Sequence, residues 1–147
     1  MGEFYLEDFT VGRRFISATH RLDADQIKTF AARFDPQPFH TDEVAAQTSF
    51  FKGLAASGWH TAAITMSLLV KSGMPIAGGL IGAGGEISWP RPTRPDDVLQ
   101  VESEILAVTP SRSRPERGTI TVKSETKNQN GEVVQMLTSK MLVWRRP

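Results

Sequence analysis

Residues 57–71 read SGWHTAAITMSLLVK, and this stretch decides the fold because it predicts a long helix with almost no polar face. Apolar side chains recur there at intervals of three and four residues, and they are Trp59, Ala62, Ala63, Met66, Leu69 and Val70. Ile64 and Leu68 extend the apolar surface further around the helix axis. We therefore expect a buried helix over residues 57–71, ended by Gly73 and Pro75.

The sequence after this helix consists mainly of predicted strands. A glycine-rich stretch at residues 78–85 leads into a strand that runs to about Trp89, and longer strands are expected at residues 98–108, 118–128 and 132–145. In the first of the longer strands, Leu99, Val101, Ile105 and Ala107 alternate with Gln100, Glu102 and Glu104, which predicts one dry face and one wet face. Only the apolar helix could cover the dry face. The expected fold is therefore α+β, a curved antiparallel sheet wrapped around one long central helix, which is the hotdog arrangement.

The sequence before the central helix predicts a strand, a short helix and a rigid loop. A strand is expected at residues 13–21, and Asp23 can cap a helix whose apolar face comprises Ile27, Phe30, Ala31 and Phe34. Pro36 and Pro38 should stop this helix, so residues 35–42 are expected to form an irregular loop. A helical turn is expected to follow at residues 43–47.

Composition excludes several classes of function. The 147 residues suit one domain, residues 1–147, and the formal charge of +1 provides no field for gathering nucleic acid. The chain has no cysteine and three scattered histidines, so we expect no disulfide and no metal site. No apolar run approaches the length of a signal peptide or a membrane span, and we expect a soluble, cytoplasmic protein that needs no membrane.

The segment with chemical content reads DPQPFHTD at residues 35–42. Asp35 and His40 are five positions apart on a proline-stiffened loop, so both can face one small volume. A carboxylate and an imidazole can take a proton from water and return one to carbon, which is what adding water to a double bond requires. The alternative is structural: Asp35 turns the chain after the helix, and His40 bonds Asp42.

The start of the central helix adds a second candidate site. Ser57 and Gly58 lie where the helix begins, so the Gly58 N–H has no partner within the helix and lies at the positive end of the helix dipole. Glycine leaves room for a carbonyl oxygen to approach. This position is therefore a candidate oxyanion hole.

The chain resembles the MaoC-like dehydratases and (R)-specific enoyl-CoA hydratases, and the resemblance extends over nearly the whole domain. It rests on Phe30, Ala31, the Asp35 to His40 spacing, Asp42, Ala45, Phe51, Gly53, Ala56, Ser57 and Gly58, and continues through Trp89, Pro92, residues 95–99 and residues 128–133. The resemblance implies that Asp35 and His40 act on one water, that Gly58 polarises a thioester carbonyl with Ser57 beside it, and that Gln37 and Asp42 support the pair. For Asp42, a plain helix N-cap is an equal alternative.

By the same resemblance, the substrate would be a trans-2-enoyl thioester of coenzyme A and the product an (R)-3-hydroxyacyl thioester, with no metal or organic cofactor. Side-by-side pairing of hotdog sheets would give a homodimer or a higher homo-oligomer. Four positions differ from the family pattern: Phe34, Gln37, Ser57 and Met66. Two other functions stay open, an acyl-CoA thioesterase and a domain that binds an acyl thioester without turnover.

Overall fold

The computed structural model describes residues 3–147 and contains one five-stranded antiparallel sheet with a helix across it. The strands are β1 (Arg14–Leu22), β2 (Ile81–Ser88), β3 (Asp97–Pro110), β4 (Arg117–Lys127) and β5 (Val133–Trp144). Their order in the sheet is β1-β3-β4-β5-β2, which leaves β1 and β2 at the edges. All four neighbouring pairs are antiparallel. The prediction of a hotdog fold is confirmed.

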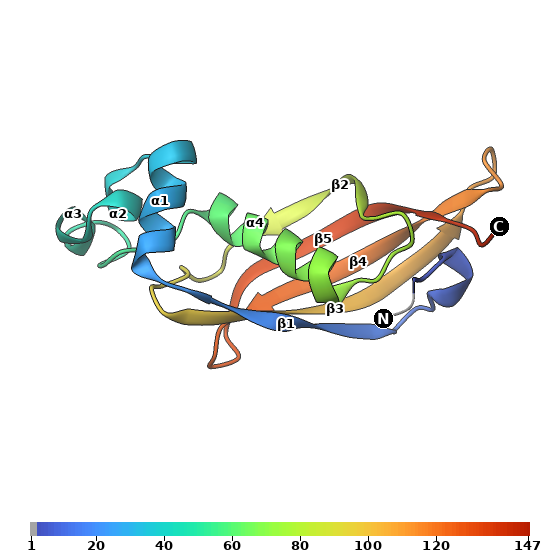
Figure 1. The fold of residues 1–147 in the computed structure, drawn as a ribbon, viewed down its shortest axis with the longest axis horizontal. Coiled ribbons are helices and arrows are strands. Elements are labelled where there is room, and N and C mark those ends of the chain that lie inside the picture. The colour runs from blue at the N-terminus through green and yellow to red at the C-terminus, as the bar shows by residue number, and fades with distance from the viewer. Residues whose placement is uncertain (1–2) are drawn as a thin grey trace.

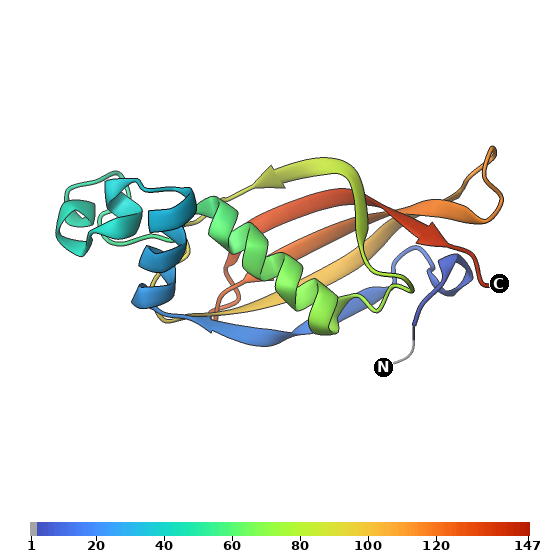
Figure 2. The same ribbon diagram turned by 45° about the horizontal axis from the view of Figure 1, so that its top comes forward.

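The central helix α4 (Gly58–Leu68) lies along the concave face of the sheet, as Figures 1 and 2 show. It continues into a short π-helical segment, η2 (Leu69–Gly73), so the helical stretch ends two residues later than predicted. The alternating strand β3 behaves as its sequence indicates, because Leu99, Val101 and Ile105 are buried against this helix layer. A register shift follows Ile105, and Leu106 is exposed as a result.

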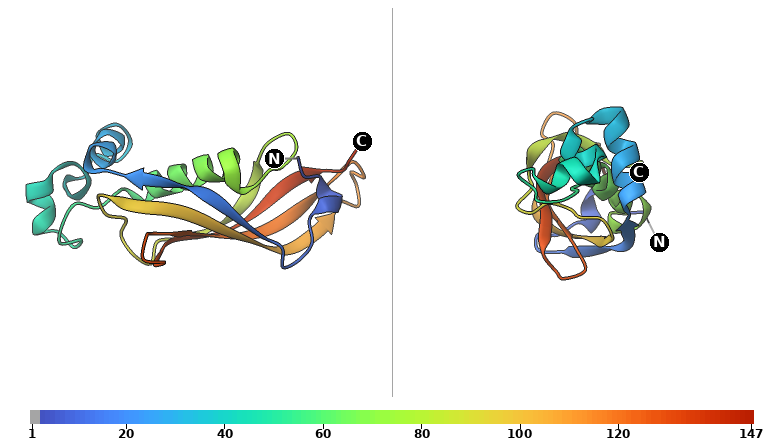
Figure 3. Two further views of the ribbon diagram at one scale, coloured as in Figure 1. Left: turned by 60° about the horizontal axis from the view of Figure 1, so that its bottom comes forward. Right: turned by 90° about the vertical axis from the view of Figure 1, so that its left-hand side faces the viewer.

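Three short helices form an overhang at one end of the sheet (Figures 1 and 3), and they are α1 (Ala24–Phe34), α2 (Pro38–Thr41) and α3 (Glu43–Gln47). Asp23 caps α1 by accepting from the Gln26 N–H, as predicted. The expectation of an irregular loop over residues 35–42 is wrong in part, since Pro38 starts the single turn α2. Proline suits the first position of a helix because its missing N–H would have no partner there.

The prediction that α4 is buried on nearly all sides is also wrong in part. Its inward face carries Ile64, Leu68 and two buried threonines, Thr61 and Thr65. Trp59 and Met66 of α4 point outward and are 62% and 44% exposed, and Val70 of the following η2 is 58% exposed. Phe34 of α1, expected on the apolar face, is likewise 65% exposed. The threonine hydroxyls can be buried because they form hydrogen bonds inside the protein. The Thr65 hydroxyl lies 2.6 Å from the hydroxyl of Thr126 on β4.

Candidate active site

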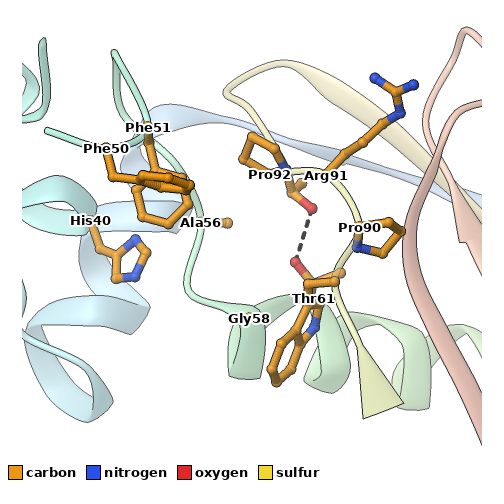
Figure 4. Close-up of a pocket in the computed structure, with 11 residues that line it drawn as sticks. His40, Phe50, Phe51, Ala56, Gly58, Thr61, Pro90, Arg91 and Pro92 are labelled. Atoms are coloured by element: carbon orange, nitrogen blue, oxygen red, sulfur yellow. Dashed lines mark hydrogen bonds between the residues drawn. The ribbon is translucent and has the colours of Figure 1, made fainter.

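A cavity of about 420 Å³ lies where the overhang meets the start of α4. Its wall is made by α2, the loop before α4, the first turn of α4 and the segment after β2. Figure 4 shows His40, Phe50 and Phe51 on one side of this space, with Thr61, Pro90 and Pro92 on the other. Ala56, Gly58, Trp89, Arg91 and Thr93 complete the lining. The cavity therefore joins the two segments that the sequence analysis singled out.

Asp35 and His40 form a close pair at this wall, and of the two only His40 lines the cavity. The Asp35 Oδ2 atom lies 3.4 Å from His40 Nε2, and the two side chains are only 16% and 5% exposed. Asp35 is the residue that follows α1, whereas His40 belongs to α2. The turn between them, fixed by Pro36 and Pro38, brings the groups together as the spacing predicts.

The backbone selects the tautomer of a neutral His40 ring. Its Nδ1 atom lies 2.5 Å from the carbonyl oxygen of Ala55. Because a carbonyl can only accept, Nδ1 carries a hydrogen and the Nε2 of a neutral ring presents its lone pair. Nε2 and the Asp35 carboxylate are then both acceptors, and one water molecule that donates to each would bridge them.

Asp35 is held in its ionised form by three neighbours. Burial would raise the pKa of the carboxyl group, but hydrogen bonding by Ser57 and Gln37 lowers it, and a positive charge on His40 lowers it further whenever that ring is protonated. Gln37 Nε2 donates to Asp35 Oδ1 at 2.6 Å. The Asp35 carboxylate is thus available as a base at neutral pH.

Ser57 presents an unusual hydroxyl. It occupies the N-cap position of α4 but makes no side-chain capping bond. The residue is 0% exposed, and its Oγ atom has no partner in good hydrogen-bond geometry, although it lies close enough to Asp35 to lower the pKa of that carboxyl group. A buried hydroxyl without a partner is costly, so this atom is suited to hold a bound water or a substrate oxygen.

Gly58, the first residue of α4, has no backbone acceptor for its N–H within residues 3–147. Its lack of a side chain has a packing reason as well. A Cβ atom at this position would lie 2.7 Å from the Trp89 indole, so the ring packs directly on the glycine. Both the free donor and the glycine identity agree with the candidate oxyanion hole.

Hydrogen bonds to backbone carbonyls hold the loop before α4 in place beside the overhang. The Ala55 N–H donates to the Phe39 carbonyl at 3.1 Å, and the Ala56 N–H donates to the Thr93 carbonyl at 2.9 Å. The Arg94 guanidinium donates to the carbonyls of Gly53 and Leu54 from the other side. The sequence did not predict these hydrogen bonds, because every residue has a backbone carbonyl and a residue pattern cannot show which carbonyls accept.

The chain is similar to known proteins in both sequence and structure. The family model described as "MaoC like domain" matches residues 9–128. This protein belongs to the MaoC-like family. A MaoC-like dehydratase from Rhodospirillum rubrum is 64% identical in structure-based alignment, with a TM-score of 0.97, and the match covers 98% of this chain and 99% of that one.

Two further relatives of the MaoC-like protein are more distant. An uncharacterized protein of Bacillus subtilis (strain 168), YdeM, is 38% identical over 127 residues, which are 84% of this chain and 87% of that protein. The (R)-hydratase from A. caviae involved in PHA biosynthesis has a TM-score of 0.73 at 24% identity, covering 95% of this chain and 99% of the other. The similarity to the A. caviae protein is one of fold alone.

In this MaoC-like protein, Asp42 is used as a helix cap. Its Oδ1 atom accepts from the N–H groups of Val44 and Ala45 at 2.9 and 3.1 Å. The hydrogen bonds therefore support the N-cap alternative for Asp42. Gln37, in contrast, contacts Asp35 directly.

The two histidines outside the pair have structural contacts. His20 Nε2 lies 2.7 Å from Gln26 Oε1. The His60 ring stacks on Phe30 with centroids 4.3 Å apart, and burial first, then the charge of His20, lowers its pKa to about 4. His60 is therefore neutral at physiological pH.

An arginine side chain can bind a phosphate group, and the arginines of residues 91–117 lie in different places. Arg91 lines the cavity and pairs with Glu132 at 3.1 Å. Arg112 and Arg114 belong to the turn between β3 and β4, which Figure 1 shows at the end of the sheet opposite the overhang. Of the described helices, none is both long and apolar enough to span a bilayer.

Proposed function

We propose that this protein adds water to, or removes it from, a trans-2-enoyl thioester of coenzyme A, with an (R)-3-hydroxyacyl thioester as the hydrated form. The observation that carries the proposal is the buried Asp35–His40 pair, in which the Ala55 carbonyl fixes the imidazole so that its lone pair faces the carboxylate. Membership of the MaoC-like family supports the class of reaction.

In the hydration direction, the oxygen of the bridging water bonds to C3 of the enoyl group while one of its protons passes to the Asp35–His40 pair. Negative charge develops on the thioester oxygen, and the Gly58 N–H stabilises it by donating a hydrogen bond. The pair then returns a proton to C2, which restores its starting protonation state. Each atom of water ends on the product, so the reaction needs no metal or organic cofactor.

Ser57 and Gln37 have positioning roles in this scheme. Both lower the pKa of Asp35, and Ser57 has a buried hydroxyl that the protein leaves without a well-formed bond. The Ser57 hydroxyl therefore orients the Asp35 carboxylate or the reacting water.

The test follows the enoyl-thioester absorbance with crotonyl-CoA beside an assay for free thiol, on the parent protein and on Asp35→Asn. We expect the absorbance to fall without thiol release, and the rate to drop roughly 10²–10⁴-fold in the variant. Release of thiol would identify a thioesterase instead. Tight binding of the thioester without either change would identify a binding domain.

We also propose that two copies pair through β2 and the outward face of α4. β2 is an edge strand that pairs only with β5, and its residues are mostly exposed. Trp59, Met66 and Val70 add an apolar stripe beside it. Light scattering should give a dimer mass for the parent, and Val70→Glu should shift the protein toward monomer; a monomeric parent would contradict the proposal.

A further inference from the structure

Two indole rings stand between the candidate active site and a second cavity. Trp89 lines the cavity that contains His40 and Gly58. Trp59 lines a separate cavity of about 390 Å³ between α4 and β2. The two rings meet edge to face, with centroids 5.4 Å apart and planes at 80°. We call this pair the partition, because each ring lines one of the two cavities and the rings touch each other, with Trp89 39% and Trp59 62% exposed to solvent.

The second cavity suits a hydrocarbon chain. Its large lining side chains are Met66 on α4, Leu80 and Ile87 at β2, and Leu137 and Met141 on β5. The remaining lining residues are three glycines, Glu86 and Ser139 in addition to Trp59. A cavity lined mainly by apolar side chains would accept the methylene groups of an acyl chain if the partition were open.

The partition is held closed by Trp89. The indole Nε1 donates to Gln135 Oε1 at 3.0 Å, and Gln135 is 0% exposed. Gln135 is fixed in turn by a bond from its Nε2 to the Thr65 hydroxyl at 3.1 Å. One face of the ring rests on Gly58. With one edge bonded and one face packed, Trp89 cannot turn aside without breaking a partly buried hydrogen bond and leaving the buried Gln135 amide oxygen without this donor.

Next to the partition, two threonines form part of the wall of the active-site cavity. Thr61 and Thr93 line it, are 1% and 2% exposed, and share a hydrogen bond of 3.0 Å between their hydroxyls, which is the dashed line at Thr61 in Figure 4. A long alkyl chain could pass through this wall only by separating the two hydroxyls, which would break their buried hydrogen bond. The wall therefore disfavours a long chain as well.

We infer that Trp89, which Trp59 contacts edge to face, sets an upper limit on acyl length, so that this protein acts on short-chain enoyl thioesters; the cavity of about 420 Å³ lies at the small end of the usual range for ligand pockets. The inference rests on the proposed hydratase function and names its substrate class. Trp89 is a specificity-determining residue in this scheme, and Trp59 acts through it.

The experiment measures kcat/KM for crotonyl-CoA and for oct-2-enoyl-CoA and follows their ratio in four proteins. The parent should favour crotonyl-CoA at least about 10-fold, because crowding by even one methylene commonly costs that much. Trp89→Ala should raise the octenoyl-to-crotonyl ratio at least about 10-fold, through KM of the longer substrate. Trp89→Phe keeps a ring beside Gly58 but loses the bond to Gln135, so its ratio should rise less than that of Trp89→Ala. Val70→Ala trims an exposed apolar side chain away from the partition and should keep the parent's ratio.

A change in crotonyl turnover alone would reflect the contact of Trp89 with Gly58 and would leave the ratio at its parent value, which overturns the inference. Equal kcat/KM of the parent for both substrates overturns it too. If no enoyl thioester is hydrated, the proposed function fails, and the same four proteins are then titrated with butyryl-CoA and octanoyl-CoA by calorimetry. A rise in the octanoyl-to-butyryl affinity ratio in Trp89→Ala would support the partition; an unchanged ratio, or no binding of either ligand, would overturn it.

Discussion

The two segments that meet at the site satisfy their polar groups in opposite ways. On the overhang, Asp35 and His40 are bonded by the protein itself, through Gln37 and the Ala55 carbonyl. At the start of α4, the buried Ser57 hydroxyl has no partner in good geometry, and the Gly58 N–H has no backbone acceptor among the described residues. The overhang therefore holds groups ready for proton transfer, whereas the helix start leaves groups that a ligand or water must complete.

The largest expected effect is on turnover, in variants of Asp35 and His40 that test whether the two residues act as a unit. Asp35→Asn, His40→Ala and the double variant should each lose roughly 10²–10⁴-fold in kcat, and the double variant should lose little more than either single one. Steady-state kinetics with crotonyl-CoA would show this. Losses that multiply in the double variant would mean that the two groups act independently.

Gly58→Ala tests the helix start. The added Cβ would lie 2.7 Å from the Trp89 ring, so the ring or the helix end must move. We expect about 10²-fold lower kcat/KM, because displacement of about 1 Å has that effect on catalysis, and about 1–3 kcal/mol lower stability from overpacking. Kinetics and urea unfolding would measure the two effects. Normal activity in this variant would exclude Gly58 from the site.

Ser57→Ala tests whether the unpaired hydroxyl matters to Asp35. Asp35 acts as a base only when ionised, so activity falls as pH drops through its pKa. The hydroxyl lowers that pKa, and its removal should raise the pKa and move the acidic limb of the pH profile to higher pH. We expect a loss of about 10-fold in kcat for one hydrogen bond to a charged group. Ser57→Thr, which keeps a hydroxyl, is the control, and a limb that stays in place in Ser57→Ala would contradict the role.

The smallest effect concerns Asp42, which lies on the overhang but caps α3. Asp42→Ala should lower stability by about 0.5–2 kcal/mol and leave kcat unchanged, because a lost N-cap costs that much. Thermal unfolding and crotonyl-CoA kinetics would test it. A large loss of kcat at unchanged stability would show that Asp42 takes part in the active site and does not only cap α3.

The local sequence was sufficient for much of the molecule. Strand alternation placed Leu99, Val101 and Ile105 on the buried side, and the proline-bounded Asp35 to His40 spacing predicted a pair that the structure brings to 3.4 Å. The start of α4 followed from Ser57 and Gly58. These features depend on periodicity, on proline and on helix ends, which act over a few residues.

Only the tertiary structure decided which side of α4 faces inward. The helix is apolar nearly all round, so periodicity could not show that Thr61 and Thr65 turn to the sheet while Trp59 and Met66 turn away. That choice depends on hydroxyl partners from β4 and from the segment after β2, which are distant in sequence. The lone pair of His40 was decided in the same way, by a carbonyl fifteen residues further along the chain. The sequence shows which residues are apolar and how they are spaced. The hydrogen-bond partner of each buried polar atom is determined only when the chain folds.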